Sequence, residues 1–213
     1  MANPATFNIK LCSYNMYGFN NGLNMLYNIC ESFDFILLQE HWLQSADLHK
    51  LNNVHNNFTS FSVSAMDSKI ENGLLVGRPF GGTAILCKNN FLPYIELIET
   101  DSITGRFVSL RYHYNTIDIL ITNVYFPYFK TSLDYTIDCC SLIAKLEHII
   151  DNFPNCKHVL AGDYNFNCTD NNVGYSLFKH IIDDHHLVCC DNLCHNPCIN
   201  YTYCHNSFSF FMD

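Results

Sequence analysis

Stretches of apolar residues alternate with polar turn signals along the whole chain, and their spacing predicts both strands and helices. The predicted strands are short apolar or alternating stretches at residues 7–11, 34–38, 83–87, 107–112, 117–124 and 159–161. The predicted helices, with apolar side chains every three or four positions, are residues 23–30, 133–152 and 175–182. Ser132 is a suitable N-cap for the second helix, and Asn115 suits a hairpin turn between two of the strands. Strands joined by both hairpins and helices predict a mixed-sheet domain of the α/β or α+β class.

Composition agrees with a single domain over residues 1–213, because 48% of the residues are hydrophobic and only 15% are charged. No apolar stretch approaches the roughly 20 residues that cross a bilayer, and the N-terminus lacks the apolar segment of a signal peptide. We therefore expect a soluble intracellular protein. In that setting Cys12, Cys30 and Cys87, which lie beside or within apolar stretches, are best interpreted as small buried hydrophobic residues.

The net charge of the chain bears on whether it can bind nucleic acid tightly. The formal net charge is −9, from 11 Lys and Arg against 20 Asp and Glu. Affinity for DNA comes largely from Lys and Arg at the phosphates, so this balance argues against tight electrostatic binding of nucleic acid. It does not argue against phosphodiester chemistry, because a site built from metal-binding carboxylates is itself acidic.

Polar side chains follow three predicted strands at the point where each strand ends. Asn15 follows a predicted strand at residues 11–14, Glu40 one at 35–39 and Asp163 one at 158–162, and Asn165 follows two residues beyond Asp163. Carboxylate and amide oxygens are hard ligands that suit Mg²⁺ or Mn²⁺. If the strand ends converge, the sequence predicts a divalent-metal site at the rim of a sheet.

The order of these residues forms a series of motifs, which read SYNMYG at 13–18, LQEHW at 38–42, GGTAIL at 81–86, GRF at 105–107, NVYFP at 123–127 and AGDYN at 161–165. The series resembles the endonuclease/exonuclease/phosphatase superfamily. The QEHW form, with YTY at 201–203 and MD at 212–213, most resembles the endonuclease domains of non-LTR (LINE-type) retrotransposons. The resemblance implies a deoxyribonuclease I-like fold: a four-layer α/β sandwich of two packed mixed β-sheets flanked by helices, here with the last strand missing.

The resemblance also implies roles for individual residues in a Mg²⁺-dependent (or Mn²⁺-dependent) endonuclease that nicks target DNA. Glu40 would be the principal metal ligand, with Asn15 beside it. Asp163 would orient or activate the attacking water and contribute to the metal site. Asn165 would support Asp163 near the phosphate. Tyr125 would contact the scissile phosphate or its transition state.

The match has departures at its end and at one motif position. Asp213 would orient a catalytic histidine, but the Ser-Asp-His element that carries this histidine would lie beyond Asp213, so we expect the domain to be incomplete and the 213-residue chain to be unstable and inactive. His41, His185 and His186 lie in other contexts and do not substitute by motif. Tyr17 stands where abasic-site repair enzymes usually carry an acidic residue, so we do not expect abasic-site repair.

Alternatives remain open. A superfamily phosphatase or phosphodiesterase acting on another phosphoester is one, and a catalytically dead retroelement remnant is another. Association with membranes is not expected. The resemblance implies a reverse transcriptase domain elsewhere in the full-length element protein, and it also implies access to the nucleus. Zinc ligands are available in Cys189, Cys190, Cys194, His195, Cys198, Cys204 and His205. Their spacing contains no CxxC pair, so loop and core thiols are the favoured interpretation.

Overall fold

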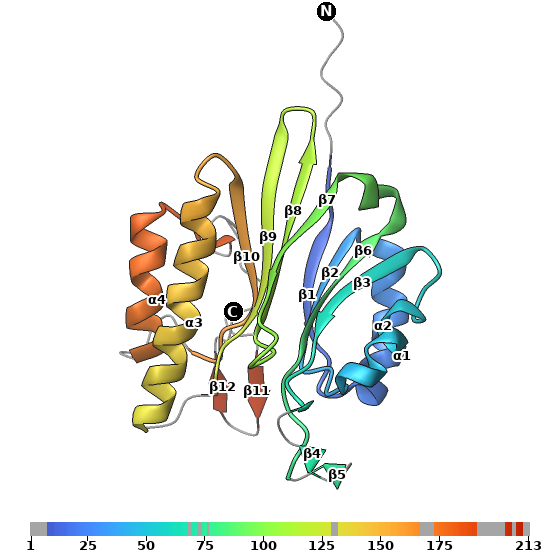
Figure 1. The fold of residues 1–213 in the computed structure, drawn as a ribbon, viewed down its shortest axis with the longest axis horizontal. Coiled ribbons are helices and arrows are strands. Elements are labelled where there is room, and N and C mark those ends of the chain that lie inside the picture. Colours follow the sequence, from blue (N-terminus) through green and yellow to red (C-terminus); the bar gives the residue numbers. More distant parts are fainter. Residues whose placement is uncertain are drawn as a thin grey trace, which may run out of the picture.

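The fold consists of two four-stranded β-sheets that pack face to face, with helices on the two outer faces (Figure 1). The computed structural model describes residues 8–67, 70–71, 74–75, 77–128, 132–166 and 173–190, and the backbone of 203–205 and 208–210. The first sheet has the order β1 (Leu11–Asn15), β2 (Phe35–Gln39), β6 (Thr83–Lys88) and β3 (Phe58–Val63). The second has the order β10 (Lys157–Asp163), β9 (Ile117–Tyr125), β8 (Phe107–Tyr114) and β7 (Ile95–Thr100).

Each sheet is mixed in the same way. The pairs β1–β2 and β10–β9 are parallel, and every other pair in the two sheets is antiparallel. Helices α1 (Phe19–Ser32) and α2 (His49–Asn52) cover the first sheet, and α3 (Leu133–Asn152) and α4 (Val173–Asp184) cover the second (Figure 1). The predicted fold class, two packed mixed sheets flanked by helices, is therefore confirmed.

Short elements complete the chain. Among the described residues these include the 3-10 helices Ser45–Asp47 and Asn89–Tyr94, the hairpin strands β4 (Ile70–Glu71) and β5 (Leu74–Leu75), and the antiparallel pair β11 (Tyr203–His205) and β12 (Phe208–Phe210). Of the helices in the described ranges, none combines the length and the hydropathy needed to cross a bilayer.

The core is layered like the fold. Between the sheets, fully buried side chains of β2 and β6 meet those of β8, including Phe35, Ile85 and Leu110. A separate apolar cluster lies beneath α1 and α2, and a third lies beneath α3 and α4. Every residue of β2 is buried because both of its faces are covered, which explains why its sequence is a continuous apolar stretch.

The predicted strand at residues 11–14 is confirmed as β1 (Leu11–Asn15), whereas the alternating stretch at 7–11 is not a strand over residues 8–10, and Phe7 lies outside the described residues. The backbone carbonyl of Lys10 accepts hydrogen bonds from the amides of Asp34 and Phe35, so the pairing with β2 starts at this carbonyl and continues from Leu11 onward. Within the two four-stranded sheets, the sequence did not predict two strands, β3 and β7. Both are edge strands, and their partly exposed, polar-rich sequences lack the apolar signal of the buried strands.

The predicted helix after Ser132 is confirmed with its cap. The Ser132 side chain accepts a hydrogen bond from the backbone amide of Tyr135 at 3.3 Å, and the helix ends at Asn152. This helix packs its buried stripe against β9 and β10, and so fixes the outer layer against the strands that carry the candidate site.

The topology brings two strand ends together. β1 and β10 are edge strands of different sheets, and they contact each other where the two sheets meet. Each is parallel to its neighbour, so the carboxyl ends of β1, β2, β9 and β10 all lie at the same end of the sandwich. Functional side chains at those ends can therefore meet across the two sheets.

Candidate active site

The candidate site lies at this shared end of the two sheets. Asn15 is the last residue of β1, Tyr125 the last of β9 and Asp163 the last of β10, and Glu40 directly follows β2. Asn165 lies two residues beyond β10. The structure brings these side chains together, because hydrogen bonds and electrostatic interactions connect the residues of one sheet to those of the other.

Asp163 is the centre of one half of the site. Its Oδ2 accepts a hydrogen bond from Asn15 Nδ2 at 2.7 Å, and its Oδ1 accepts one from the backbone amide of Asn165 at 3.1 Å. The Asn165 side chain donates to the carbonyl of Phe126 at 2.9 Å. Both oxygens of the carboxylate are thereby held, and the amides fix its orientation.

Glu40 is the centre of the other half. Its Oε1 accepts a hydrogen bond from the Tyr125 hydroxyl at 2.5 Å, and its Oε2 accepts one from Trp42 Nε1 at 3.1 Å. The guanidinium of Arg106 donates to the backbone carbonyl of Tyr125 at 3.2 Å and lies 5.6 Å from the centre of its ring. Tyr125 is therefore held at both its hydroxyl and its backbone.

Burial and neighbouring charge shift the acidity of these groups. Burial raises the pKa of the Asp163 carboxyl, and the nearby Glu40 carboxylate adds to the effect, although the hydrogen bonds from Asn15 and Asn165 oppose it. Burial also raises the pKa of the Tyr125 hydroxyl, as does its hydrogen bond to Glu40. Asp163 is thus a stronger base than a solvated aspartate, and Tyr125 keeps its proton at neutral pH.

The donor set fits a hard divalent cation. In the described part of the chain, no three His, Cys, Asp or Glu side chains are grouped closely enough to bind a metal ion by themselves. A cation here would instead share the carboxylates of Glu40 and Asp163 with amide oxygens such as Asn15 Oδ1 and with water. Mg²⁺ commonly binds proteins in this manner, through one or two carboxylates with water and substrate phosphates.

A buried polar layer beneath the site was missed by the sequence analysis. Gln39, the last residue of β2, donates from Nε2 to Asn123 Oδ1 at 2.6 Å. Asn123 in turn donates to the carbonyls of Leu38 and Ala84, each at 2.8 Å. Both side chains are almost fully buried, and they connect the two sheets directly below Glu40. The motif series could have indicated this layer, because Gln39 lies in LQEHW and Asn123 in NVYFP. Taken singly, however, Gln and Asn side chains are usually exposed.

His41 is a structural residue. It is fully buried, its Nε2 lies 3.0 Å from the carbonyl of Val63, and its Nδ1 accepts from the amide of Leu43 at 3.0 Å. Burial lowers its pKa to about 4, so the ring is neutral and already fully hydrogen-bonded at physiological pH. Gly82 packs against this ring: a Cβ atom there would lie 2.4 Å from His41 Cε1. The histidine fixes the loop that carries Glu40.

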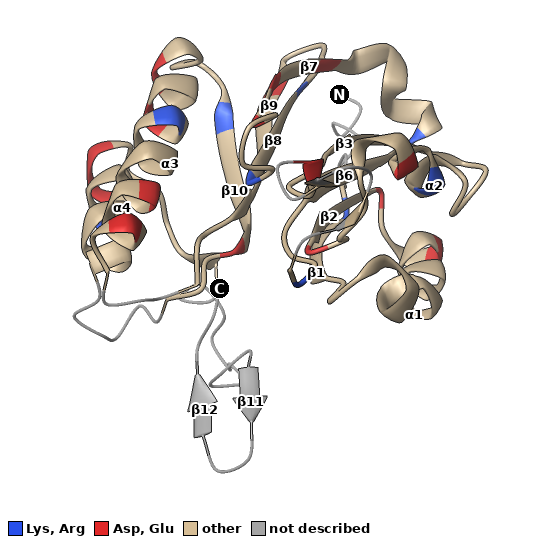
Figure 2. Cartoon of the chain, turned by 60° about the horizontal axis from the view of Figure 1, so that its bottom comes forward, with Lys and Arg blue, Asp and Glu red and all other residues tan. Residues whose placement is uncertain are grey.

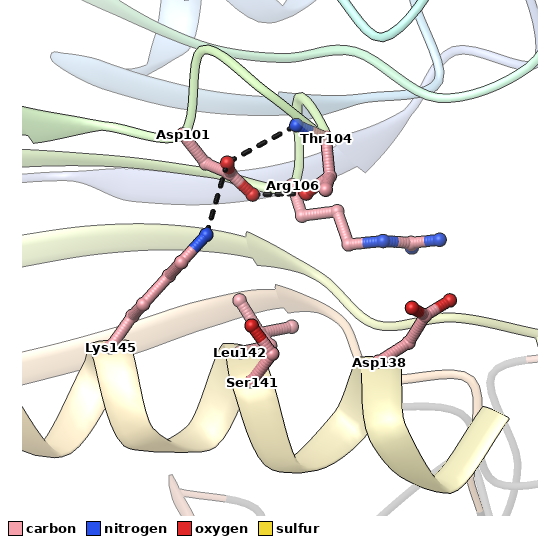
Figure 3. Close-up of a pocket in the computed structure, with 7 residues that line it drawn as sticks. All are labelled: Asp101, Thr104, Arg106, Asp138, Ser141, Leu142 and Lys145. Carbon is pink, nitrogen blue, oxygen red and sulfur yellow. Dashed lines mark hydrogen bonds and ion pairs between the residues drawn. The ribbon is translucent and has the colours of Figure 1, made fainter. Parts of the chain in front are cut away.

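Arg106 also borders a small cavity of about 30 Å³ between the turn after β7 and helix α3 (Figure 3). On its other side, Asp101 accepts hydrogen bonds from the Thr104 amide at 3.2 Å and from Lys145 Nζ at 3.3 Å. A further bond joins the Thr104 hydroxyl to Asp101. These contacts fasten the turn that carries Arg106 to α3, and so support the arginine that holds Tyr125.

The remaining predicted residues fall elsewhere. Asp213 lies outside the described residues, as do Cys194, His195 and Cys198, and only the backbone of Cys204 and His205 is described, so neither prediction is tested. The interpretation of Cys12, Cys30 and Cys87 as packed apolar residues agrees with the structure, in which Cys30 and Cys87 are buried and Cys12 is half-buried. Burial raises the pKa of the three thiols to about 12, 11 and 12 respectively.

A comparison with protein-family models decides the family. The model described as "Endonuclease/Exonuclease/phosphatase family" matches residues 12–183. The chain belongs to this family. The match covers β1 to α4, and so includes Asn15, Glu40, Tyr125, Asp163 and Asn165. A comparison with curated proteins finds no significant match.

Solved structures of this family share the fold. An AP endonuclease, LMAP from Leishmania major, is similar with a TM-score of 0.63 and 13% identity over 83% of this chain and 66% of that chain. The endonuclease domain of TRAS1, a telomere-specific non-LTR retrotransposon, is similar with a TM-score of 0.57 and 10% identity over 83% and 72%. The 3′ phosphatase NExo from Neisseria, bound to a product DNA hairpin, is similar with a TM-score of 0.59 and 16% identity over 83% and 71%.

These identities establish the common fold of the family and not a shared substrate. The chain spans just under two thirds of the length of the Leishmania structure. The three neighbours include two kinds of endonuclease and a phosphatase. What family membership supports directly is hydrolysis of a phosphoester, and the choice among substrates rests on the site.

Proposed function

We propose that this chain, as one domain over residues 1–213, is a metal-dependent phosphodiesterase, and that its substrate is target DNA that it nicks for retrotransposition. The observation that carries the proposal is the meeting of Glu40 and Asp163 across two sheets, each held by an amide or hydroxyl donor. The ordered motif series and the fold shared with the TRAS1 endonuclease domain support the DNA substrate. A reverse transcriptase domain of the same element protein, and access to the nucleus, belong to this proposal.

Glu40 and Asn15 would hold the divalent ion, Mg²⁺ or Mn²⁺, and Asp163 and Asn165 would contribute to the same metal site. When bound, such an ion polarises a phosphoryl oxygen and stabilises the charge of the leaving oxygen. The hydrogen bonds that Glu40 accepts from Tyr125 and Trp42 occupy one direction at each carboxylate oxygen. Each oxygen keeps a further lone pair for a cation.

Asp163 would orient the attacking water and accept its proton. Its raised pKa makes it a more effective base than a solvated carboxylate, and Asn15 and Asn165 hold it in one orientation. Asn165, next to it, would place its side chain near the phosphate. Asp213 keeps its proposed role, which is to orient the catalytic histidine of a Ser-Asp-His strand.

Tyr125 would donate a hydrogen bond to a phosphate oxygen. Its raised pKa keeps the hydroxyl protonated, so it remains a donor throughout the reaction. In the structure the Tyr125 hydroxyl donates this proton to Glu40 Oε1, with 2.5 Å between the two oxygens. A rotation of the hydroxyl away from Glu40 would turn this donor toward a bound phosphate oxygen. A donor aimed at the charge that develops in the transition state lowers the barrier more than it strengthens substrate binding.

The test is nicking of supercoiled plasmid by a protein in which the chain continues past Asp213 into a Ser-Asp-His strand, because the resemblance assigns the catalytic histidine to that strand. We expect nicking with Mg²⁺ or Mn²⁺ and none with a chelator. Glu40→Gln and Asp163→Ala should each lower the rate by about 10²-fold or more. Glu99→Gln, an exposed carboxylate on β7, is the matched control and should have no effect.

Other substrates give distinct outcomes. Hydrolysis of phosphate monoesters without nicking of DNA would refute the endonuclease and point to the phosphatases of the family, among which NExo is a structural neighbour. The absence of turnover on any phosphoester would indicate a catalytically dead domain. Undiminished nicking by the Asp163→Ala protein would refute the role given to Asp163.

A further inference from the structure

An aromatic pair lies beside Glu40: Trp42, which donates a hydrogen bond to Glu40, and Tyr17, which has no role in the proposed hydrolysis. The rings of Tyr17 and Trp42 have their centres 5.0 Å apart with an angle of 59° between their planes. Tyr17 is 58% exposed, so much of its ring is open to solvent. Arg78, also exposed, donates from its guanidinium to the Tyr17 hydroxyl at 3.3 Å.

The pair is tethered to the candidate metal ligands. Trp42 donates from Nε1 to Glu40 Oε2, and the backbone amide of Tyr17 donates to Asn15 Oδ1 at 3.0 Å. Tyr17, Glu40 and Trp42 all adopt positive φ angles, of 49°, 54° and 57°. Non-glycine residues pay for this conformation, and such strain is concentrated at ligand-binding sites. An open aromatic face is therefore presented at a fixed position next to Glu40.

We propose that Tyr17, backed by Trp42, is the stacking site for a nucleobase of the DNA substrate, and that Arg78 contacts the backbone phosphate beside that base. This inference rests on the proposed DNA substrate. Its chemistry is that of proteins that bind unpaired strands, in which bases stack on aromatic rings and Arg neutralises the backbone. A base must leave the helical stack to reach such a ring, so the bound nucleotide is single-stranded or flipped out of a duplex.

Charge supports stacking over phosphate contacts alone. The chain has a net charge of −9, and Figure 2 shows Lys and Arg as scattered positions over the described residues. Bulk electrostatics therefore cannot supply most of the affinity for a polyanion. Stacking is independent of charge, and a ring next to Glu40 would use it to place the neighbouring phosphate at the metal ligands.

The chain provides its own probe of this site, because Trp42 is its only tryptophan. We would titrate the 213-residue chain with a short oligothymidine in the presence of a chelator, so that binding is observed without cleavage. Quenching of Trp42 fluorescence reports binding at the site, and the anisotropy of a fluorescein-labelled strand reports binding anywhere. An abasic strand of the same length has the same phosphates and no bases.

We expect the oligothymidine to quench Trp42 and to bind about tenfold or more tightly than the abasic strand, the effect of one stacked base. Tyr17→Ala should weaken oligothymidine binding by a similar factor and leave abasic binding unchanged. Tyr17→Phe keeps the ring and should bind within about twofold of the unchanged chain. Tyr27→Ala, which removes an exposed tyrosine from α1, is the matched control.

The outcomes separate this inference from the proposed function. Equal binding of the oligothymidine and abasic strands, or unchanged binding by Tyr17→Ala, overturns the stacking site even if metal-dependent nicking is intact. Failure of the unchanged chain to bind any DNA strand overturns it as well. Absence of metal-dependent nicking, with base-dependent binding intact, counts against the endonuclease and leaves the stacking site standing.

Discussion

Replacement of Gly82 by alanine tests whether His41 holds the loop of Glu40 in place. Gly82 has φ of +85°, and a Cβ atom there would lie 2.4 Å from Cε1 and 2.6 Å from Nε2 of the buried His41 ring. Gly77 offers a matched control, because its φ of +89° is nearly the same and a Cβ atom there would meet nothing within 4 Å. Both alanine variants have the same strained backbone conformation, but only in Gly82→Ala does the new Cβ atom collide with another side chain.

The magnitudes follow from these two terms. A left-handed backbone costs an alanine roughly 1–2 kcal/mol relative to glycine, and this term applies to both variants. Forcing an extra methyl group into packed surroundings costs roughly 1–3 kcal/mol more, and this term applies only beside His41. We therefore expect Gly82→Ala to lose about 2–5 kcal/mol of unfolding free energy and Gly77→Ala about 1–2 kcal/mol.

The assay is urea unfolding followed by the fluorescence of Trp42, with the denaturant dependence compared among the variants to verify that each unfolds in the same way. Trp42 donates a hydrogen bond to Glu40, so a change in its fluorescence on adding Mg²⁺ should report ion binding at the site. Gly82→Ala should weaken this Mg²⁺ binding as well, because His41 adjoins Glu40 in the chain. Equal loss of stability in the two variants would refute the reasoning. It would mean that the His41 ring moves aside at no cost and does not fix the loop.

Three further predictions concern side chains of the site and of the cavity beside it. Burial raises the pKa of Asp163, so ionisation of this carboxyl opposes folding. The stability that the carboxyl contributes is present below its unfolded pKa of about 3.9 and is lost as the pH rises through its folded pKa. The Tm of Asp163→Asn should therefore rise relative to that of the unchanged chain as the pH goes from acidic to neutral. A Tm difference that does not vary with pH would contradict this. At Asp101 burial is outweighed by hydrogen bonds and by Lys145, which hold the pKa low, so its contribution is present above about pH 3.9 and lost below it (Figure 3). Asp101→Ala should therefore cost about 1–3 kcal/mol in urea unfolding at neutral pH and little in acid. Tyr125→Phe should slow plasmid nicking by about 10²-fold without weakening the Mg²⁺ titration of Trp42, and weaker Mg²⁺ binding would place the tyrosine in the metal site instead.

Much of the fold could be predicted from the sequence because buried elements carry strong patterns. The strand at Phe35–Gln39 is covered on both faces and is apolar throughout, and the helix Leu133–Asn152 has both an apolar stripe and a cap. The edge strands Phe58–Val63 and Ile95–Thr100 were missed because an edge needs no continuous apolar signal. The meeting of β1 with β10 depends on pairing across the whole chain, and local periodicity does not contain that information.

The candidate site was predictable as a set of residues but not as a set of contacts. Strand-end positions and motif order selected Asn15, Glu40 and Asp163. No pattern indicated that Asn15 would donate to Asp163, or that Trp42 would donate to Glu40. These bonds depend on loop conformations that are set by distant packing, and the sequence provides no local signal for them.

Backbone strain around the candidate site shows how distant packing holds its loops in place. Among the described residues, most of the non-glycine positions with positive φ surround the site: Tyr17, Glu40, Trp42 and Asn165. Each costs the fold of order 1 kcal/mol, and only over-determined surroundings can hold it. The buried bonds of His41, the polar layer beneath Glu40 and the amides around Asp163 provide such surroundings. Because the loops are held before any ligand binds, little ordering entropy remains to be lost when a cation and a phosphate arrive. For the proposed DNA substrate, this preorganisation would offset the weak electrostatic attraction between a polyanion and a chain of net charge −9.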